Sequence, residues 1–216
     1  MTATARGSAL DVIVFDFDGV ILNSMPLKTT TFGRLFEDLG PEASAYVRAY
    51  HVEHAGVSRY VKFEHFYQKF HGRSVTPEES AALDRRFAEL AMQELLRTPT
   101  LPGAREFLEA HHATWPLYVA SGAPQYELDA VLGAMGLARC FKAICGAPPA
   151  KAEVLRRIVQ AEGADPARVL MIGDANTDLA AARAVGTRFL GVGPFPEPVV
   201  WMADLTGLPG YIASLG

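Results

Sequence analysis

Two aspartates near the start of the chain carry its strongest chemical signal. Asp16 and Asp18 end an apolar run at residues 12–15 and are followed by Gly19. Residues i and i+2 of a strand face the same side, so both carboxyl groups can gather at the strand's carboxyl end, where open α/β sheets bind ligands. Two close carboxylates repel each other unless a cation or a shared proton relieves them. Mg²⁺ would do so, because it takes oxygen ligands and few protein carboxylates. The alternative is a strand that enters a simple Asp-Gly turn.

Apolar periodicity predicts the elements around this pair. Residues 11–16 are apolar without alternation, which is typical of a buried parallel strand. Residues 25–98 show helical spacing only, with a strong helix start at Thr76-Pro77 and a breaker cluster at residues 98–103. Beyond it, strands are predicted at 117–120, 143–145, 169–172 and 188–192, and helices at 102–112, 125–135, 150–162 and 177–185.

This order of elements predicts the fold class and the domains. Strands that alternate with helices indicate an α/β fold with a doubly wound parallel sheet. The helical stretch is then a small cap inserted after the first strand. We expect the core to comprise residues 1–23 and 99–216 and the cap residues 24–98, with linkers near 22–25 and 98–102.

Polar side chains stand at the ends of the predicted strands and at the helix starts that follow them. They are Ser121 and Gly122 after 117–120, Lys151 before or at a helix start, and Gly173, Asp174, Asn176 and Asp178 after 169–172. Carboxylates, a hydroxyl, a backbone N–H beside glycine and a lysine can together hold a phosphoryl group and a metal ion. Plain alternatives exist: turns at Ser121 and Asp174, and a first-turn acid at Asp178. Lys151 could be solvated, although a cation at a helix start opposes the helix dipole.

Composition excludes several classes of function. The chain has 216 residues, of which 50% are hydrophobic and 20% charged, as in an ordinary globular protein. A net charge of −4 gives no reason to expect nucleic acid. No apolar run approaches the ~20 residues that cross a bilayer, and residues 1–9 lack the apolar segment of a secretory leader. Cys140 and Cys145 are too few for a disulfide scaffold and are expected to be reduced packing residues. We expect a cytoplasmic protein, monomeric or homodimeric, that contacts neither nucleic acid nor a membrane.

Taken together, these motifs resemble those of the haloacid dehalogenase superfamily, and the resemblance covers nearly the whole chain. The four superfamily motifs have counterparts at Asp16-Phe17-Asp18-Gly19, Ser121, Lys151 and Gly173-Asp174-Ala175-Asn176-Thr177-Asp178. The resemblance implies that Asp16 is a nucleophile and Asp18 a general acid and base. It also implies that Ser121, with Gly122 beside it, and Lys151 hold the phosphoryl oxygens.

The resemblance further implies a metal site and a reaction type. Mg²⁺ would be bound by Asp16, Asp174 and the backbone carbonyl of Asp18, with Asp178 in support nearby. Members named for dehalogenation lack an aspartate at the place of Asp18 and need no metal, so this chain is similar to the phosphate-ester members.

The helical insert resembles the small cap of the phosphoglycolate phosphatase and β-phosphoglucomutase branch. The segment Gly56-Val57-Ser58-Arg59 is similar to the cap loop that meets substrate in the mutase. This implies that Arg59 holds a second anionic group of the substrate by a bidentate contact; the alternative is a helix start with Arg59 in solvent. Lys28 stands where the mutase has a histidine, and Asn23 replaces a common acid, so both residues weaken the mutase interpretation. Lys28 either binds an anionic group of the substrate or faces solvent.

The expected function is therefore that of a Mg²⁺-dependent phosphatase. It would hydrolyse a small phosphate monoester, of the phosphoglycolate or sugar phosphate type, through an aspartyl-phosphate on Asp16. One alternative is a sugar-phosphate mutase that uses the same site. Another, of a different class, is a catalytically silent binding or regulatory protein on the same scaffold.

Overall fold

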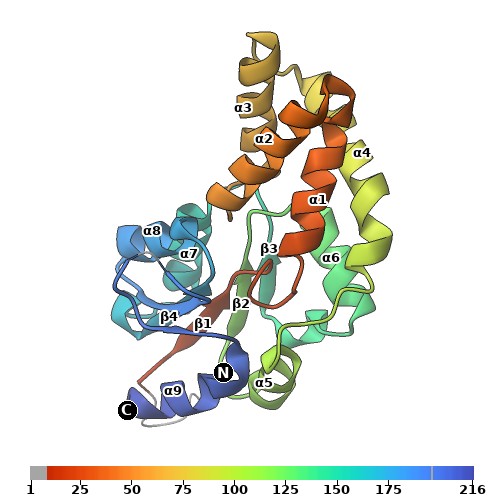
Figure 1. Ribbon diagram of the computed structural model, residues 1–216. Helices are drawn as coiled ribbons and strands as arrows, with labels where there is room; N and C mark the ends of the chain where they lie inside the picture. The colour runs from red at the N-terminus through yellow and green to blue at the C-terminus, as the bar shows by residue number, and fades with distance from the viewer. Residues whose placement is uncertain (1–8, 196) are drawn as a thin grey trace.

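Six parallel strands form the centre of the molecule in the order β3-β2-β1-β4-β5-β6. The computed structural model describes residues 9–195 and 197–216. The prediction that residues 1–9 are not a secretory leader therefore falls almost wholly outside the described residues. The strands are β1 (Val12–Phe15), β2 (Leu117–Ala120), β3 (Ala143–Cys145), β4 (Val169–Gly173), β5 (Arg188–Val192) and β6 (Trp201–Met202). β1 lies in the middle of the sheet, with β2 on one side and β4 on the other (Figure 1). The strand order therefore reverses at β1, which is where sheets of this class bind ligands.

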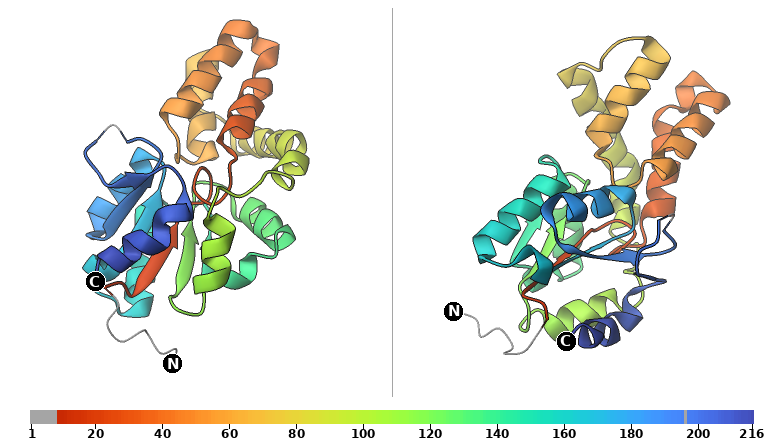
Figure 2. Two further views of the ribbon diagram at one scale, coloured as in Figure 1. Left: turned by 60° about the horizontal axis from the view of Figure 1, so that its bottom comes forward. Right: turned by 90° about the vertical axis from the view of Figure 1, so that its left-hand side faces the viewer.

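Helices cover both faces of the sheet (Figure 2). On one face are α7 (Lys151–Glu162) and α8 (Asn176–Val185), and on the other are α5 (Ala104–His111), α6 (Gln125–Ala134) and α9 (Leu208–Ser214). Successive residues of β1 serve the two faces in turn. Val14 packs in the cluster with α7 and α8, whereas Phe15 packs in the larger cluster with α5 and α6. This arrangement confirms the predicted doubly wound α/β sheet.

Four helices between β1 and α5 form a separate group above the carboxyl ends of the strands (Figure 1). They are α1 (Met25–Leu35), α2 (Pro41–Glu53), α3 (Arg59–His71) and α4 (Pro77–Leu95). Buried rings fill the space between them, with Phe32 of α1 only 5.0 Å from Phe87 of α4. The predicted helix start at Thr76 is a full capping box, because Glu79 N–H donates to Thr76 Oγ1 at 3.2 Å and Thr76 N–H donates to Glu79 Oε2 at 3.0 Å.

The two segments that lead into and out of this helical group run side by side. Leu22 forms an antiparallel bridge with Thr100. Leu101 N–H donates to Ile21 O at 2.9 Å. The entry and exit of the helical group are thus held together by backbone hydrogen bonds, at the breaker-rich segments that the sequence marks.

Some elements differ from the sequence-based prediction. α5 begins at Ala104 and not at residue 102, because Gly103 has φ +79°, outside the helical region. β6 and α9 lie beyond the last predicted element, as does the short 3₁₀ turn Leu205–Gly207; further 3₁₀ turns are Glu37–Leu39, Ala138–Cys140 and Pro166–Arg168. Both cysteines are free thiols, as predicted. Among the described residues, no helix is both long and apolar enough to span a bilayer.

Gly103 offers a test of how the C-terminal segment packs on the core. A Cβ at this position would lie 2.4 Å from backbone atoms of Leu205 and Thr206, whereas a Cβ at Gly136, with φ +69°, would meet nothing within 4 Å. Gly136→Ala should cost about 1–2 kcal/mol for the left-handed backbone alone. Gly103→Ala should cost roughly 1–3 kcal/mol more, because the backbone of residues 205–206 must move. Urea unfolding of both variants measures the difference, and equal losses would show that the close approach contributes nothing.

Candidate active site

The carboxyl ends of the three central strands bring the predicted polar residues together. Asp16 follows β1, Ser121 follows β2 and Asp174 follows β4. The sheet's hydrogen bonding continues one residue past the strands: Asp16 N–H donates to Ile172 O at 2.8 Å, and Ser121 N–H donates to Cys145 O at 2.9 Å. These bonds fix the backbone at both positions, so the two side chains are aimed by the sheet and not by a mobile loop.

Lys151, at the start of α7, joins this cluster to the end of β1 and to α8. Its Nζ lies 2.5 Å from Asp16 Oδ2 and 2.5 Å from Asp178 Oδ1. Lys151 is the first residue of α7 and is only 8% exposed, so its interpretation as a solvated residue is wrong. Burial opposes its charge, but the two carboxylates more than offset burial and raise the pKa of Lys151. The ammonium therefore stays charged beside Asp16.

Carboxylates outnumber cations at this point. One oxygen from each of Asp16, Asp174 and Asp178 lies within 4.8 Å of the other two. Burial, followed by the charges of Asp16 and Asp178, raises the pKa of Asp174 to about 8. Burial and Asp178 likewise raise the pKa of Asp16, to about 7, although Lys151 contacts it. One ammonium cannot neutralise three carboxylates, so the donor set fits an added hard cation.

Asp174 and Asp178 play different parts in this cluster. Asp178 is fully buried; it accepts from Lys151 and, at 3.1 Å, from Ala175 N–H. Within the part of the chain that the structure describes, no group donates a hydrogen bond to the Asp174 carboxylate. Gly19, with φ +74°, makes room for it, because a Cβ there would lie 2.0 Å from Asp174 Oδ2. Asp174 is thus free to bind a cation, whereas Asp178 is held by protein groups.

Asp18 faces the helical group. It accepts hydrogen bonds from Ser24 Oγ at 2.5 Å and from Lys28 Nζ at 2.6 Å. Burial alone would raise its pKa, but Lys28 and Ser24 outweigh burial and lower it. Asp16 and Asp18 therefore have opposite pKa shifts, although one residue separates them. Two neighbouring carboxyl groups with different proton affinities can take different roles in a reaction.

The two expected substrate residues of the cap are already paired with carboxylates. Lys28 Nζ also lies 2.5 Å from Glu127 Oε1. Arg59 Nη2 binds the other oxygen of Glu127, and Arg59 Nη1 lies 3.0 Å from Asp84 Oδ1. Both cations are 4% exposed, so their interpretation as solvent-facing residues is wrong. The Arg59 guanidinium joins α3 to α6 and α4 in this structure, and its expected contact with a second anionic group of the substrate stays a prediction.

Three residues that line or support this site were not expected from the sequence. They are Glu127, His51 and Lys62, all buried. Glu127 is a first-turn acid of α6, a common position that gives no warning of its two cationic partners. Lys62 did carry a signal, because it lies three residues after Arg59 and therefore on the same face of α3.

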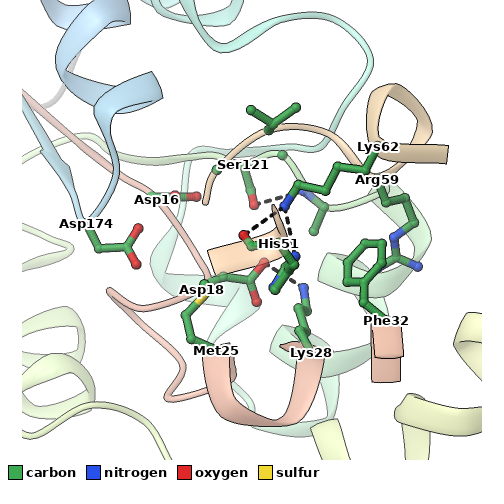
Figure 3. A pocket seen from close by; sticks show the side chains of 14 residues that line it. Asp16, Asp18, Met25, Lys28, Phe32, His51, Arg59, Lys62, Ser121 and Asp174 are labelled. Carbon is green, nitrogen blue, oxygen red and sulfur yellow. Dashed lines mark hydrogen bonds and ion pairs between the residues drawn. The ribbon is translucent and has the colours of Figure 1, made fainter. Parts of the chain in front are cut away.

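These residues enclose a small pocket between the helical group and the sheet (Figure 3). Its volume is about 30 Å³, which is room for roughly two water molecules. The segment at Gly56 closes one side, since a Cβ on Gly122 would lie 2.5 Å from Gly56 O. The helical group therefore contacts the edge of the sheet beside this pocket.

Comparison with known proteins gives consistent matches. A family model described as haloacid dehalogenase-like hydrolase matches residues 10–186. A phosphoglycolate phosphatase of Rhodospirillum rubrum is 29% identical, over 94% of this chain and 88% of the relative. Among solved structures, a β-phosphoglucomutase of Clostridium difficile aligns with a TM-score of 0.75 at 17% identity, covering 95% of this chain and 96% of that one. CbbY of Rhodobacter sphaeroides in complex with phosphate aligns with a TM-score of 0.73 at 18% identity, covering 92% and 96%.

Glu127→Gln tests how far the closed arrangement depends on one buried carboxylate. The variant leaves Lys28 and Arg59 buried with one carboxylate partner each. We expect the free energy of unfolding to fall by about 3 kcal/mol, the lower end of the range for a broken buried pair. Glu153→Gln is the matched control, because Glu153 pairs with Arg157 on the surface of α7 with 48% of its side chain exposed; it should cost less than about 0.5 kcal/mol. Denaturant unfolding that gives equal values for the two variants would contradict a structural role for Glu127.

Proposed function

Because the chain belongs to the haloacid dehalogenase-like hydrolases, we propose that it is a Mg²⁺-dependent phosphatase. Its substrate is a small phosphate monoester, and its intermediate is an aspartyl-phosphate on Asp16. The observation that carries the proposal is the contact of Lys151 with Asp16 beside Asp174, which forms no salt bridge with any described residue. This set combines a carboxylate nucleophile, a fixed positive charge for the phosphoryl oxygens and open ligands for a metal ion.

Asp16 and Asp174 are the side chains that would hold Mg²⁺, together with the backbone carbonyl of Asp18. When bound, the ion neutralises charge on the phosphoryl group. Asp178 keeps Lys151 in place, with its second oxygen fixed by Ala175 N–H. Ser121 and Lys151 bind phosphoryl oxygens that Asp16 would otherwise repel. This role for Lys151 requires its ammonium to exchange part of its contact with Asp16 for contact with the substrate.

The reaction takes two displacements at phosphorus. A carboxylate oxygen of Asp16 forms a bond to phosphorus while the bond between phosphorus and the ester oxygen breaks. The leaving alcohol takes a proton from Asp18. Water then attacks the aspartyl-phosphate and gives a proton back to Asp18, and inorganic phosphate and the Asp16 carboxylate are released. Because Lys28 and Ser24 lower the pKa of Asp18, the closed site favours the form that accepts the proton from water.

A panel of phosphate esters tests the proposal directly. Purified protein should release inorganic phosphate from a small monoester, such as phosphoglycolate or a sugar phosphate, with Mg²⁺ but not with chelator. No release from any ester, including p-nitrophenyl phosphate, would favour a silent binding protein. Conversion of β-glucose 1-phosphate to glucose 6-phosphate with little free phosphate would favour the mutase alternative.

Asp16→Asn should abolish turnover without unfolding the protein. An amide cannot form the phosphoenzyme, whereas it keeps the size of the carboxyl group and removes a repulsive charge. We expect a loss of at least about a thousandfold in kcat, as for other lost nucleophiles, with an unchanged far-UV circular dichroism spectrum. A variant that keeps a tenth of the wild-type rate would exclude Asp16 as the nucleophile.

Asp174→Ala should weaken Mg²⁺ binding more than Asp178→Ala. Asp174→Ala would remove a direct ligand of Mg²⁺. Asp178→Ala would remove only a supporting partner, which typically costs about 10–100-fold in metal affinity. Isothermal titration of Mg²⁺ into both variants measures the two effects, and activity should follow the same order. An unchanged titration for Asp174→Ala would remove it from the metal site.

The stabilising effect of Mg²⁺ should grow with pH. The pKa values of Asp16 and Asp174 are raised to about 7 and about 8. Between about pH 4 and pH 8 the metal-free folded state therefore binds more protons than the unfolded state, and its stability falls as pH rises. Mg²⁺ competes with those protons, so it should raise the Tm more at about pH 8.5 than at about pH 6. Thermal unfolding with and without Mg²⁺ gives this increment, and an increment that shrinks with pH would contradict the assignment.

A further inference from the structure

Lys62, a cation that lines the pocket, has no carboxylate at salt-bridge distance among the described residues. Lys28, Arg59 and Lys151 each lie within salt-bridge distance of two carboxylates. Lys62 of α3 lines the same pocket as Asp16 and Asp18, but it forms no salt bridge with any residue that the structure describes. Its Nζ instead lies 2.8 Å from His51 Nδ1 and 3.5 Å from His51 O (Figure 3).

Lys62 is also deeply buried, which makes the missing partner costly. The residue is 2% exposed, and its Nζ lies 5.3 Å from the centre of the Phe32 ring. Burial, with repulsion by Lys28 and Arg59, lowers its pKa to about 7 despite some attraction by Asp18. A buried ammonium without a counter-charge is unfavourable, so a ligand that brings negative charge here gains the interaction that the protein leaves open.

The neighbouring His51 also has a polar atom that lacks a hydrogen-bond partner among the described residues. Burial, followed by the charge of Lys62, lowers the pKa of His51 to about 2, so the imidazole is neutral. If Lys62 donates to Nδ1, the ring proton is on Nε2, and Nε2 is a buried atom without a hydrogen-bond partner. His51 also lines the pocket. The pair therefore brings to the wall of the pocket a lysine nitrogen without a carboxylate at salt-bridge distance and an imidazole whose Nε2 has no partner among the described residues.

The position of the pair identifies the part of the substrate that it would meet. Lys62 and His51 come from the cap helices α3 and α2, whereas the proposed nucleophile Asp16 belongs to the sheet. Lys62 and His51 line the same pocket as Asp18, and in the proposed reaction Asp18 protonates the leaving oxygen. The pair therefore lies on the leaving-group side of the reacting phosphorus.

We propose that Lys62, supported by His51, is a specificity-determining residue that binds a second anionic group on the alcohol part of the substrate. The inference rests on the proposed phosphatase function and narrows its substrate class to phosphate esters that carry a carboxylate or a second phosphate. The contact with a second anion that was expected at Arg59 is assigned by this proposal to Lys62, because Glu127 and Asp84 already hold the Arg59 guanidinium. A neutral sugar monophosphate leaves the Lys62 ammonium without a partner and is a poor substrate.

A merely structural role for Lys62 is the rival explanation. His51 lies in the last turn of α2, where a cation near the helix's carbonyl groups is favourable. Loss of such a support would affect all substrates alike. The test must therefore compare esters that differ only in the second anion.

Matched ester pairs separate the two explanations. Phosphoglycolate is compared with ethyl phosphate for a carboxylate, and fructose 1,6-bisphosphate with fructose 1-phosphate for a second phosphate. Wild-type kcat/KM should favour the doubly anionic member of at least one pair. Lys62→Met, which keeps the length and packing of the side chain, should raise KM for that member roughly 10–100-fold, the loss expected for a charge-assisted contact. The rise in KM that Lys62→Met causes for the singly anionic member should be at least tenfold smaller. Lys62→Arg should restore part of the preference for the doubly anionic member. Lys69→Met, at an exposed position of the same helix, is the control and should change neither.

A binding measurement keeps the inference testable if turnover fails. Calorimetric titration of the favoured ester, or of phosphoglycolate and fructose 1,6-bisphosphate if none is hydrolysed, uses the Asp16→Asn protein with and without Lys62→Met. At least a tenfold weaker Kd in the double variant supports the proposal. Equal losses on both members of each pair, no preference in the wild type, or an unchanged Kd would overturn it. Lys62→Gln serves the same comparisons if Lys62→Met does not fold. Absence of hydrolysis with retained Lys62-dependent binding would count against the phosphatase function and not against this anion site.

Discussion

The contact of Lys151 with two buried carboxylates organises the site. A cation at the first position of a helix is opposed by the helix dipole, and this one is also buried, so it depends on Asp16 and Asp178 for its charge. The same ammonium joins the end of β1, the start of α7 and the start of α8. The polar groups at the edge of the sheet are consequently placed before any substrate arrives. Pre-placed charges are what phosphoryl transfer needs most, because such a reaction asks the protein for positioning and neutralisation rather than for covalent chemistry.

A second network couples the helical group to the chemistry. Glu127, on the core helix α6, accepts from both Lys28 of α1 and Arg59 of α3. Lys28 in turn holds Asp18, whose pKa it lowers. Any movement of α1 away from the sheet would therefore change the proton affinity of Asp18 as well as the access of water. The position of α1 and the proton affinity of Asp18 are linked through one lysine side chain, which a histidine at that position could not replicate with the same reach and charge.

Local patterns predicted what depends on local sequence. The strands at 117–120, 143–145 and 188–192 have the predicted limits, because short runs rich in apolar residues between turn residues are typical of parallel strands. Residues after these strands met at one edge because parallel strands share their carboxyl ends. β6 was missed because it has two residues, and α9 because Pro209 and Gly210 are poor helix formers. The partners of Arg59 could not be predicted either, since Glu127 lies 68 residues away and meets it only when α3 packs on α6.

The backbone bridge between Leu22 and Thr100 has a consequence for how such a protein can change over time. The helical group leaves and rejoins the core at two neighbouring points, so a chain excursion of any length adds only a slowly growing loop-closure cost. The strands beneath keep their register whatever the excursion contains. A lineage could therefore exchange, enlarge or shorten the outer helices of this group while inheriting Asp16, Asp174 and Lys151 unchanged. In this architecture the outer helices are heritable apart from the carboxylates and lysine of the sheet, whereas α1 stays tied to them through the contact of Lys28 with Asp18.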